Sequence, residues 1–148
     1  MKYKIFVSGV QRELKEERFA VKEIITENIL LQEYFKVFLF EDSPAKSKSA
    51  KTSYISEVRK CDIYLGILGN EYGTVSKNNL SATEQEFYEA QDTDKEVLIY
   101  IKGKEDTKRE KGLKKLISEI KDEEAGYKYK RFNTVQELKN SIYESLID

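Results

Sequence analysis

The feature that most constrains the fold of this 148-residue chain is a regular alternation of two hydrophobic patterns. Short runs rich in β-branched and aromatic residues, typical of strands, are each followed by a stretch with the three- and four-residue apolar spacing of amphipathic helices. The strand-like runs cover residues 4–8, 37–41, 62–69, 96–102 and 127–132. This alternation predicts right-handed crossovers and a parallel sheet with helices on both faces.

The helix-like stretches cover residues 10–29, 52–59, 107–120 and 134–146, and one more begins at Ser81. The third and fourth strand-like runs are almost continuously apolar, as expected for central strands that are covered on both faces. We therefore predict an α/β, three-layer, flavodoxin-like fold whose mainly parallel five-stranded sheet has the order 2-1-3-4-5. The last strand, with its alternating lysines, should lie at an edge. Residues 1–148 are expected to form a single domain.

The charge balance and the missing residue types exclude several classes of function. Lys and Arg number 26 against 27 Asp and Glu, so no net field attracts the chain to nucleic acid or to a membrane. The sequence contains no histidine, which excludes Ser-His-Asp catalysis, Cys-His catalysis and histidine-ligated zinc. An acid or base must then be a carboxylate, a lysine or a tyrosine. No metal or bound cofactor is expected. The mixed-charge run 103–115 predicts a solvated loop and helix face, with phosphate binding as the alternative.

The lone cysteine and the amino terminus predict a cytoplasmic location. Cys61 stands beside the start of a strand, where it is expected to be a small buried hydrophobic residue. The first residues lead directly into a strand-like run without the apolar core of a signal peptide. No apolar run is long enough to cross a bilayer.

A ligand is expected where the strand order reverses, outside the carboxyl ends of the first and third strands. The first run ends at Ser8, and Gly9, Val10 and Arg12 follow where the chain passes into the first helix. Free amides at a helix start favour an anion such as a phosphate. The alternative is a tight strand-to-helix turn with no ligand, because neither a GxGxxG nor a Walker motif is present. The second run ends near Asp42, which should face the same crevice.

The segment that follows the third run, GNEYG, carries special backbone positions. Gly69 and Gly73 are predicted to take backbone angles closed to other residues and to place Tyr72 near the crevice. The pattern S-x-x-E at Ser81 and Glu84 predicts a capping box, in which the Glu84 side chain returns to the Ser81 amide. Glu84 is therefore assigned a structural role from spacing alone.

Two further charged residues lie on or near apolar stripes. Glu86 falls at the margin of the core near the strand ends, either as a solvated helix glutamate or as a site carboxylate. Arg18 falls on the apolar stripe of the first helix and needs a carboxylate partner. Glu41, Asp42 and Asp62 are the candidates, and a structural pair is favoured over a ligand contact.

Four blocks of the sequence, in order, resemble the domain of unknown function 4062 family: KIFVSGVQRELKEER, VFLFEDSPA, SYISEVRKCDIYLGILGNEYG and LSATEQEFYEA. With EVLIYIK, the resemblance covers residues 3–102 and fades beyond. It implies a domain at the amino terminus of a larger bacterial protein, with a fold similar to TIR domains and nucleoside 2-deoxyribosyltransferases. In those relatives a glutamate acts at the ribosyl carbon while an N-glycosidic bond breaks.

The resemblance places that glutamate nearest Glu86, with Glu84 as the rival and Tyr72 as an orienting group. The Trp-Cys pair that precedes the glutamate in enzymatic TIR domains is replaced by Ala82-Thr83. The preferred implied function is a TIR-like signalling or sensing module, for instance in bacterial defence, that binds a nucleotide-like ligand or a partner domain. The alternative is an enzyme that cleaves NAD or a nucleoside. Fused or associated effector domains and a homo-oligomer are the implied partners, and NAD is an implied substrate.

Overall fold

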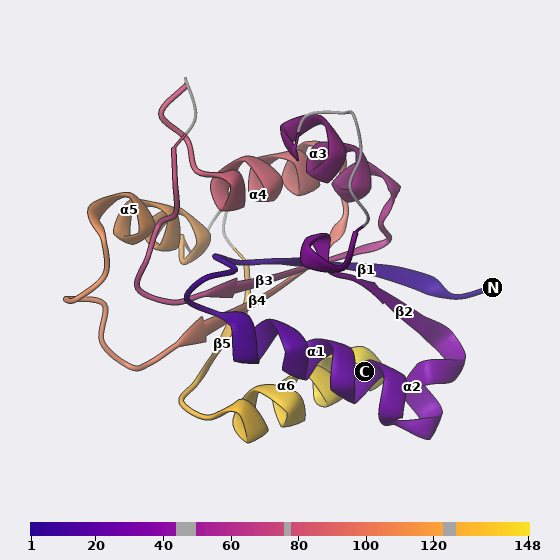
Figure 1. Cartoon of the computed structure of the whole chain (residues 1–148). Helices are drawn as coiled ribbons and strands as arrows, with labels where there is room; N and C mark the ends of the chain where they lie inside the picture. Colours follow the sequence, from indigo (N-terminus) through magenta and orange to yellow (C-terminus); the bar gives the residue numbers. More distant parts are fainter. Residues whose placement is uncertain (44–49, 76–77, 123–126) are drawn as a thin grey trace.

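The computed structural model of the chain describes residues 1–43, 50–75, 78–122 and 127–148. Its strands form one sheet in the order β2-β1-β3-β4-β5, and every pairing is parallel (Figure 1). The strands are β1 (Tyr3–Ser8), β2 (Phe35–Phe38), β3 (Ile63–Leu68), β4 (Glu96–Lys102) and β5 (Tyr129–Phe132). The predicted flavodoxin-like order, with the last strand at an edge, is confirmed.

Helices cover both faces of the sheet. They are α1 (Lys15–Glu27), α2 (Ile29–Tyr34), α3 (Ala50–Lys60), α4 (Ala82–Asp92), α5 (Lys111–Ile120) and α6 (Val135–Ile147), with a 3₁₀ turn, η1 (Phe40–Asp42). Figure 1 shows α1 and α6 on one face and α3, α4 and α5 on the other. Among the helices of the described residues, none is long and apolar enough to cross a membrane.

Each face of the sheet has its own hydrophobic core. Alternate strand residues point to opposite faces, so Phe6 and Tyr64 pack with α3, α4 and α5, whereas Ile5 and Leu65 pack with α1 and α6. All four side chains are buried. Burial on both faces explains why the central strands have almost no polar residues.

The first helix is shorter than its periodicity predicts. Residues 11–14 form a turn in which the Leu14 amide donates to the Val10 carbonyl, and α1 begins only at Lys15. At the other end, the Asn28 side chain accepts hydrogen bonds from two amides and caps the separate short helix α2. Ile29, which the sequence assigned to the first helix, is instead highly exposed.

Three other boundaries differ from the sequence prediction. The second strand, predicted at 37–41, is Phe35–Phe38, because residues 40–42 turn into η1. The Asp42 amide donates to the Leu39 carbonyl at 3.0 Å in this turn. The fourth predicted helix begins at Lys111, and β5 begins at Tyr129.

Arg109 is buried within the run predicted to be solvated. Its guanidinium donates to the carbonyl of Gly69, to the carbonyl of Lys102 at 2.8 Å and to Asp106 at 2.8 Å. One side chain thereby joins the carboxyl ends of β3 and β4 to the loop that precedes α5. Its donors serve protein acceptors, which does not support phosphate binding by Arg109.

We predict that Arg109→Met lowers the free energy of unfolding by about 3 kcal/mol, because the buried Gly69 carbonyl and two partly buried acceptors lose a charged donor. The measurement is urea unfolding followed by far-UV circular dichroism. Arg59→Met is the matched control, because the exposed Arg59 pairs with Glu89 at 3.1 Å. It should cost less than about 1 kcal/mol. Equal losses in the two variants would contradict this role for Arg109.

Candidate functional site

A cavity of about 270 Å³ lies at the carboxyl ends of β1 and β3, where the strand order reverses. This is the position predicted for a ligand in an open parallel sheet. Among the described residues, the cavity is lined by Gly9, Val10, Gln11, Arg18, Phe40, Tyr54, Gly73, Thr74, Ala82, Thr83 and Glu86. We call this cavity the Glu86 pocket.

Glu86 is a buried carboxylate in this pocket, with only 7% of its surface exposed. Its Oε1 atom accepts a hydrogen bond from the Ser8 hydroxyl at 2.6 Å. Burial raises the pKa of Glu86 from its ordinary 4.5 to about 7, against the lowering effects of the Ser8 hydrogen bond and the Arg18 charge. The interpretation of Glu86 as a solvated glutamate is therefore wrong. Near neutral pH it can both hold and release a proton.

The start of α4 explains why Glu86 points inward. Residues 83–87 are all buried, because this first turn lies between the strand ends and the loop after β3. Phe87 and Ala90 enter the core beneath the pocket. Glu86 lies on the same side of the helix as Thr83, which also lines the pocket, in agreement with the helical spacing.

Arg18 is held by a structural partner and also lines the pocket. Its guanidinium makes two hydrogen bonds to Glu41, at 2.8 and 2.7 Å, and a third to the Gly9 carbonyl at 2.9 Å. Glu41 is thus the partner among the three candidates. Burial opposes ionisation of Glu41, but the hydrogen bonds and charge of Arg18 outweigh it and lower the pKa of this carboxyl. The pair is therefore ionised at neutral pH.

Gly9 must be a glycine for two reasons. Its φ is +148°, and a Cβ atom there would lie 2.8 Å from the Ile67 carbonyl oxygen. Gly73 also has a positive φ, +98°, as predicted, and lines the pocket. At these two glycines the backbone lines the cavity without side chains.

Gly69 was predicted to have special backbone angles and to lie at the ligand site, and the structure shows neither. Its φ is not positive, and it lines a separate cavity together with Lys102 and Lys104. A side chain is excluded for another reason: a Cβ atom would lie 2.5 Å from the carboxylate of Glu13. That carboxylate accepts hydrogen bonds from the amides of residues 70 and 71, at 2.7 and 3.0 Å. Gly69 makes room for the contact between the GNEYG loop and the segment before α1.

Tyr72 and Glu84 form a structural contact outside the pocket lining. The Tyr72 hydroxyl donates to Glu84 at 2.6 Å and accepts from the Ser81 amide at 3.2 Å. Ser81 caps α4 by accepting from the Glu84 amide, but the predicted return of the Glu84 side chain is wrong, because Tyr72 occupies that position. A complete capping box is found instead at Thr134 and Glu137, the start of α6.

Two other predicted ligand-binding residues lie outside the pocket lining. Arg12 is largely exposed and pairs with Glu71 at 2.6 Å. Asp42 is half-exposed and pairs with Lys22 at 2.9 Å. Because α1 begins at Lys15, the residues after Gly9 form a turn and not the expected helix start.

Sequence reasoning missed two aromatic residues that line the pocket. Phe40 belongs to η1 and Tyr54 to α3, and their rings meet edge to face with centroids 6.3 Å apart. The sequence places Phe40 within the predicted strand 37–41, because the 3₁₀ turn η1 is not visible in the hydrophobic pattern. Among the described residues, no cluster of acidic or cysteine side chains is arranged to hold a metal ion.

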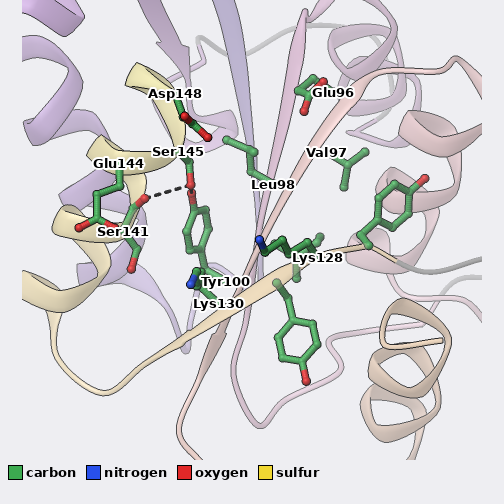
Figure 2. Close-up of a pocket in the computed structure, with 13 residues that line it drawn as sticks. Glu96, Val97, Leu98, Tyr100, Lys128, Lys130, Ser141, Glu144, Ser145 and Asp148 are labelled. Carbon is green, nitrogen blue, oxygen red and sulfur yellow. Dashed lines mark hydrogen bonds between the residues drawn. The ribbon is translucent and has the colours of Figure 1, made fainter. Parts of the chain in front are cut away.

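A second groove, of about 570 Å³, lies at the amino-terminal half of β4, between β5 and the end of α6 (Figure 2). It is lined by acidic side chains such as Glu96 and Glu144, by basic ones such as Lys128, and by the Tyr100 ring. This groove is away from the carboxyl ends of the strands, where the Glu86 pocket lies.

The fold and pocket define the chain as a flavodoxin-like α/β domain with a buried carboxylate at the switch point of its sheet. The chain belongs to the family described as Domain of unknown function (DUF4062), which it matches over residues 4–147. The match extends well beyond Lys102, where the resemblance of the sequence blocks was expected to fade.

Two solved structures are similar in fold. The CMP N-glycosidase BcmB of Clostridium botulinum superimposes with a TM-score of 0.58 at 12% identity, covering 96% of this chain and 98% of that one. Oxidised flavodoxin 1 of Bacillus cereus gives a TM-score of 0.49 at 17% identity, covering 99% of this chain and 97% of that one. A search of curated proteins finds no matching sequence.

We predict that Glu86→Gln gains stability relative to the wild type as the pH rises. The pKa of Glu86 is about 7 in the folded chain and near 4.5 in the unfolded one, so the folded state binds more protons between these values. Wild-type stability falls over this window and levels off above it. The difference between variant and wild type should grow by up to about 3 kcal/mol between pH 4.5 and about pH 8.

The measurement is urea unfolding of both proteins at several pH values. A stability difference that stays constant across this window would show that Glu86 is not a buried carboxylate with a raised pKa.

Proposed function

We propose that the Glu86 pocket binds a nucleoside-type ligand and that the domain hydrolyses its N-glycosidic bond. The observation that carries this proposal is the buried carboxylate of Glu86, fixed by Ser8 at 2.6 Å in a cavity at the switch point of the sheet. A raised pKa in a pocket is characteristic of groups that act in catalysis.

The chemistry needs only a carboxylate and water. The carbon–nitrogen bond breaks with its electron pair leaving on the base nitrogen, which takes a proton from solvent. The positive charge that develops on the ribosyl carbon is stabilised by ionised Glu86, which forms an ester with that carbon. Water then hydrolyses the ester, releasing the free sugar and restoring the carboxylate. The sequence has no histidine, and this reaction does not need one, because a carboxylate can stabilise and attack the ribosyl carbon.

The dimensions of the pocket favour a single nucleoside over a dinucleotide such as NAD. Its volume of about 270 Å³ lies below the roughly 300–1,000 Å³ that is usual for drug-sized ligands. The edge-to-face rings of Phe40 and Tyr54 provide an aromatic wall against which a flat base can stack. In this arrangement the base contacts the two rings and the ribosyl carbon faces Glu86.

The similarity in fold to BcmB is a second reason to test this domain for hydrolysis of N-glycosidic bonds. BcmB is a CMP N-glycosidase, and its similarity to this domain extends over almost the whole of both chains. At 12% identity its substrate is not transferred to this chain. Cytidine and CMP therefore belong in the first panel of compounds, beside other nucleosides.

Ligand sensing without turnover is the second candidate function. The observation that favours it is the position of Tyr72 and Glu84, which bond to each other outside the pocket lining and leave Glu86 without the predicted orienting tyrosine. In this case the pocket binds a nucleotide-like ligand and signals to fused or associated domains or to a second copy of the chain.

The test is release of free base from cytidine, uridine, adenosine, their deoxy forms, CMP and NAD, measured by liquid chromatography. We predict that at least one mononucleoside or mononucleotide is cleaved and that Glu86→Gln lowers the rate at least about 100-fold. Glu84→Gln is the matched control, since it makes the same chemical change on the same helix at a carboxylate bonded to Tyr72. It should keep the rate within about threefold, because Glu84 lies outside the pocket lining and the oxygen of a glutamine can still accept from the Tyr72 hydroxyl.

Base release that survives in Glu86→Gln, or that is lost in Glu84→Gln alone, would contradict the assignment of Glu86. Binding that depends on Glu86 without any base release would support the sensing function.

A further inference from the structure

One buried polar side chain in the Glu86 pocket has no partner among the described residues. Nine polar or charged residues of the described chain are buried, and eight of them make a hydrogen bond or an ion pair with their side chains. The exception is Thr83, which has 6% of its surface exposed and lines the pocket. Buried hydroxyl groups in proteins are normally paired, so this one requires an explanation.

The position of Thr83 in α4 explains why its hydroxyl is unpaired. A threonine inside a helix can donate to the carbonyl four residues earlier, as Thr93 does to the carbonyl of Glu89 at 2.7 Å. Thr83 is the second residue of α4, and Asn79, four residues earlier, lies outside the helix with a φ of +64°. The helix therefore offers no carbonyl to the Thr83 hydroxyl.

The Thr83 hydroxyl is open to the cavity. Throughout the described part of the chain, every fully enclosed side-chain oxygen or nitrogen has a hydrogen-bond partner. The unpaired Thr83 oxygen is thus accessible, and the space that this buried residue lines is the Glu86 pocket. The carboxylate of Glu86 also has one oxygen left for a ligand, because Oε1 accepts from Ser8 and no described residue donates to Oε2.

Thr83 and Glu86 are neighbours on the same side of α4. Residues three apart on a helix have Cβ atoms about 5–6 Å from each other. In the proposed reaction, the ribosyl carbon that carries the base faces Glu86. The next carbon of the sugar carries the 2′-hydroxyl in a ribonucleoside and only hydrogen in a 2′-deoxyribonucleoside. A ligand whose reacting carbon faces Glu86 therefore presents this position to Thr83.

We propose that Thr83 is a specificity-determining residue that bonds to the 2′-hydroxyl, so that the Glu86 pocket selects ribonucleosides over 2′-deoxyribonucleosides; this inference rests on the proposed function of the pocket. A ribonucleoside pairs the Thr83 hydroxyl, which can donate or accept. A 2′-deoxyribonucleoside covers it with a C–H group and leaves it buried and unpaired, which is unfavourable. In glycoside cleavage, hydrogen bonds to the hydroxyl beside the reacting carbon also strengthen in the transition state.

The experiment measures dissociation constants by amide NMR titration with two pairs of probes, cytidine with 2′-deoxycytidine and adenosine with 2′-deoxyadenosine. For at least one pair, the wild type should bind the ribonucleoside about tenfold more tightly, which corresponds to one hydrogen bond. Thr83→Val keeps the shape of the side chain and removes the hydroxyl, so it should lower this preference to less than about twofold. Thr83→Ser keeps the hydroxyl and should retain the preference.

Thr93→Val is the matched control, because it removes a threonine hydroxyl at the other, exposed end of the same helix. It should leave the preference unchanged. Equal binding of both members of each pair by the wild type would overturn the inference. So would a preference that survives in Thr83→Val, or one that is lost in Thr93→Val.

Failure of this inference and failure of the proposed function have different readouts. Base release is measured in the same samples by liquid chromatography. Base release that depends on Glu86, with a preference that Thr83→Val does not change, overturns the inference and leaves the proposed hydrolysis in place. A binding preference that depends on Thr83, without base release from any compound, supports the inference and contradicts hydrolysis. The absence of binding by all four nucleosides overturns both.

Discussion

The burial of one carboxylate organises the rest of this structure. Glu86 is removed from water at the carboxyl ends of β1 and β3, which is unfavourable for its charged form and raises its pKa to about 7. The Ser8 hydroxyl and the Arg18 charge offset part of this cost. Arg18 in turn is held by Glu41 and by the Gly9 carbonyl. Hydrogen bonds and charges around a single cavity thus connect β1, α1, η1 and α4.

Two neighbouring carboxylates of α4, Glu86 and Glu84, have different surroundings: Glu86 lines the pocket, and Glu84 holds the loop beside it. Glu84 and Glu86 are two positions apart on α4, and both are buried. Glu84 bonds to Tyr72 and holds the loop after β3 against the start of the helix, whereas Glu86 faces the cavity with Phe40 and Tyr54. The loop supplies Gly73 to the pocket wall, so the contact made by Glu84 supports the wall of the pocket that Glu86 lines.

Most of the fold and part of the site could be predicted from the sequence. The alternating patterns predict the strand order and the position of the crevice, and the apolar stripe of the first helix predicts that Arg18 needs a carboxylate. Features created by long-range side-chain contacts could not be predicted. The hydrogen bond to the buried Glu86 comes from Ser8, which is 78 positions away. The space at Gly69 is taken by Glu13, and Phe40 enters the pocket only because the chain turns at η1 instead of extending β2.

The measurement that tests the central claim most directly is a backbone amide NMR titration of the domain with cytidine and the other nucleosides. The account predicts concentration-dependent shifts centred on Gly9, Gln11, Thr74 and Ala82, which line the Glu86 pocket, with weaker shifts in Glu86→Gln. Shifts confined to the groove between β4 and α6, or no shifts with any nucleoside, would contradict the claim that the Glu86 pocket is a nucleoside site.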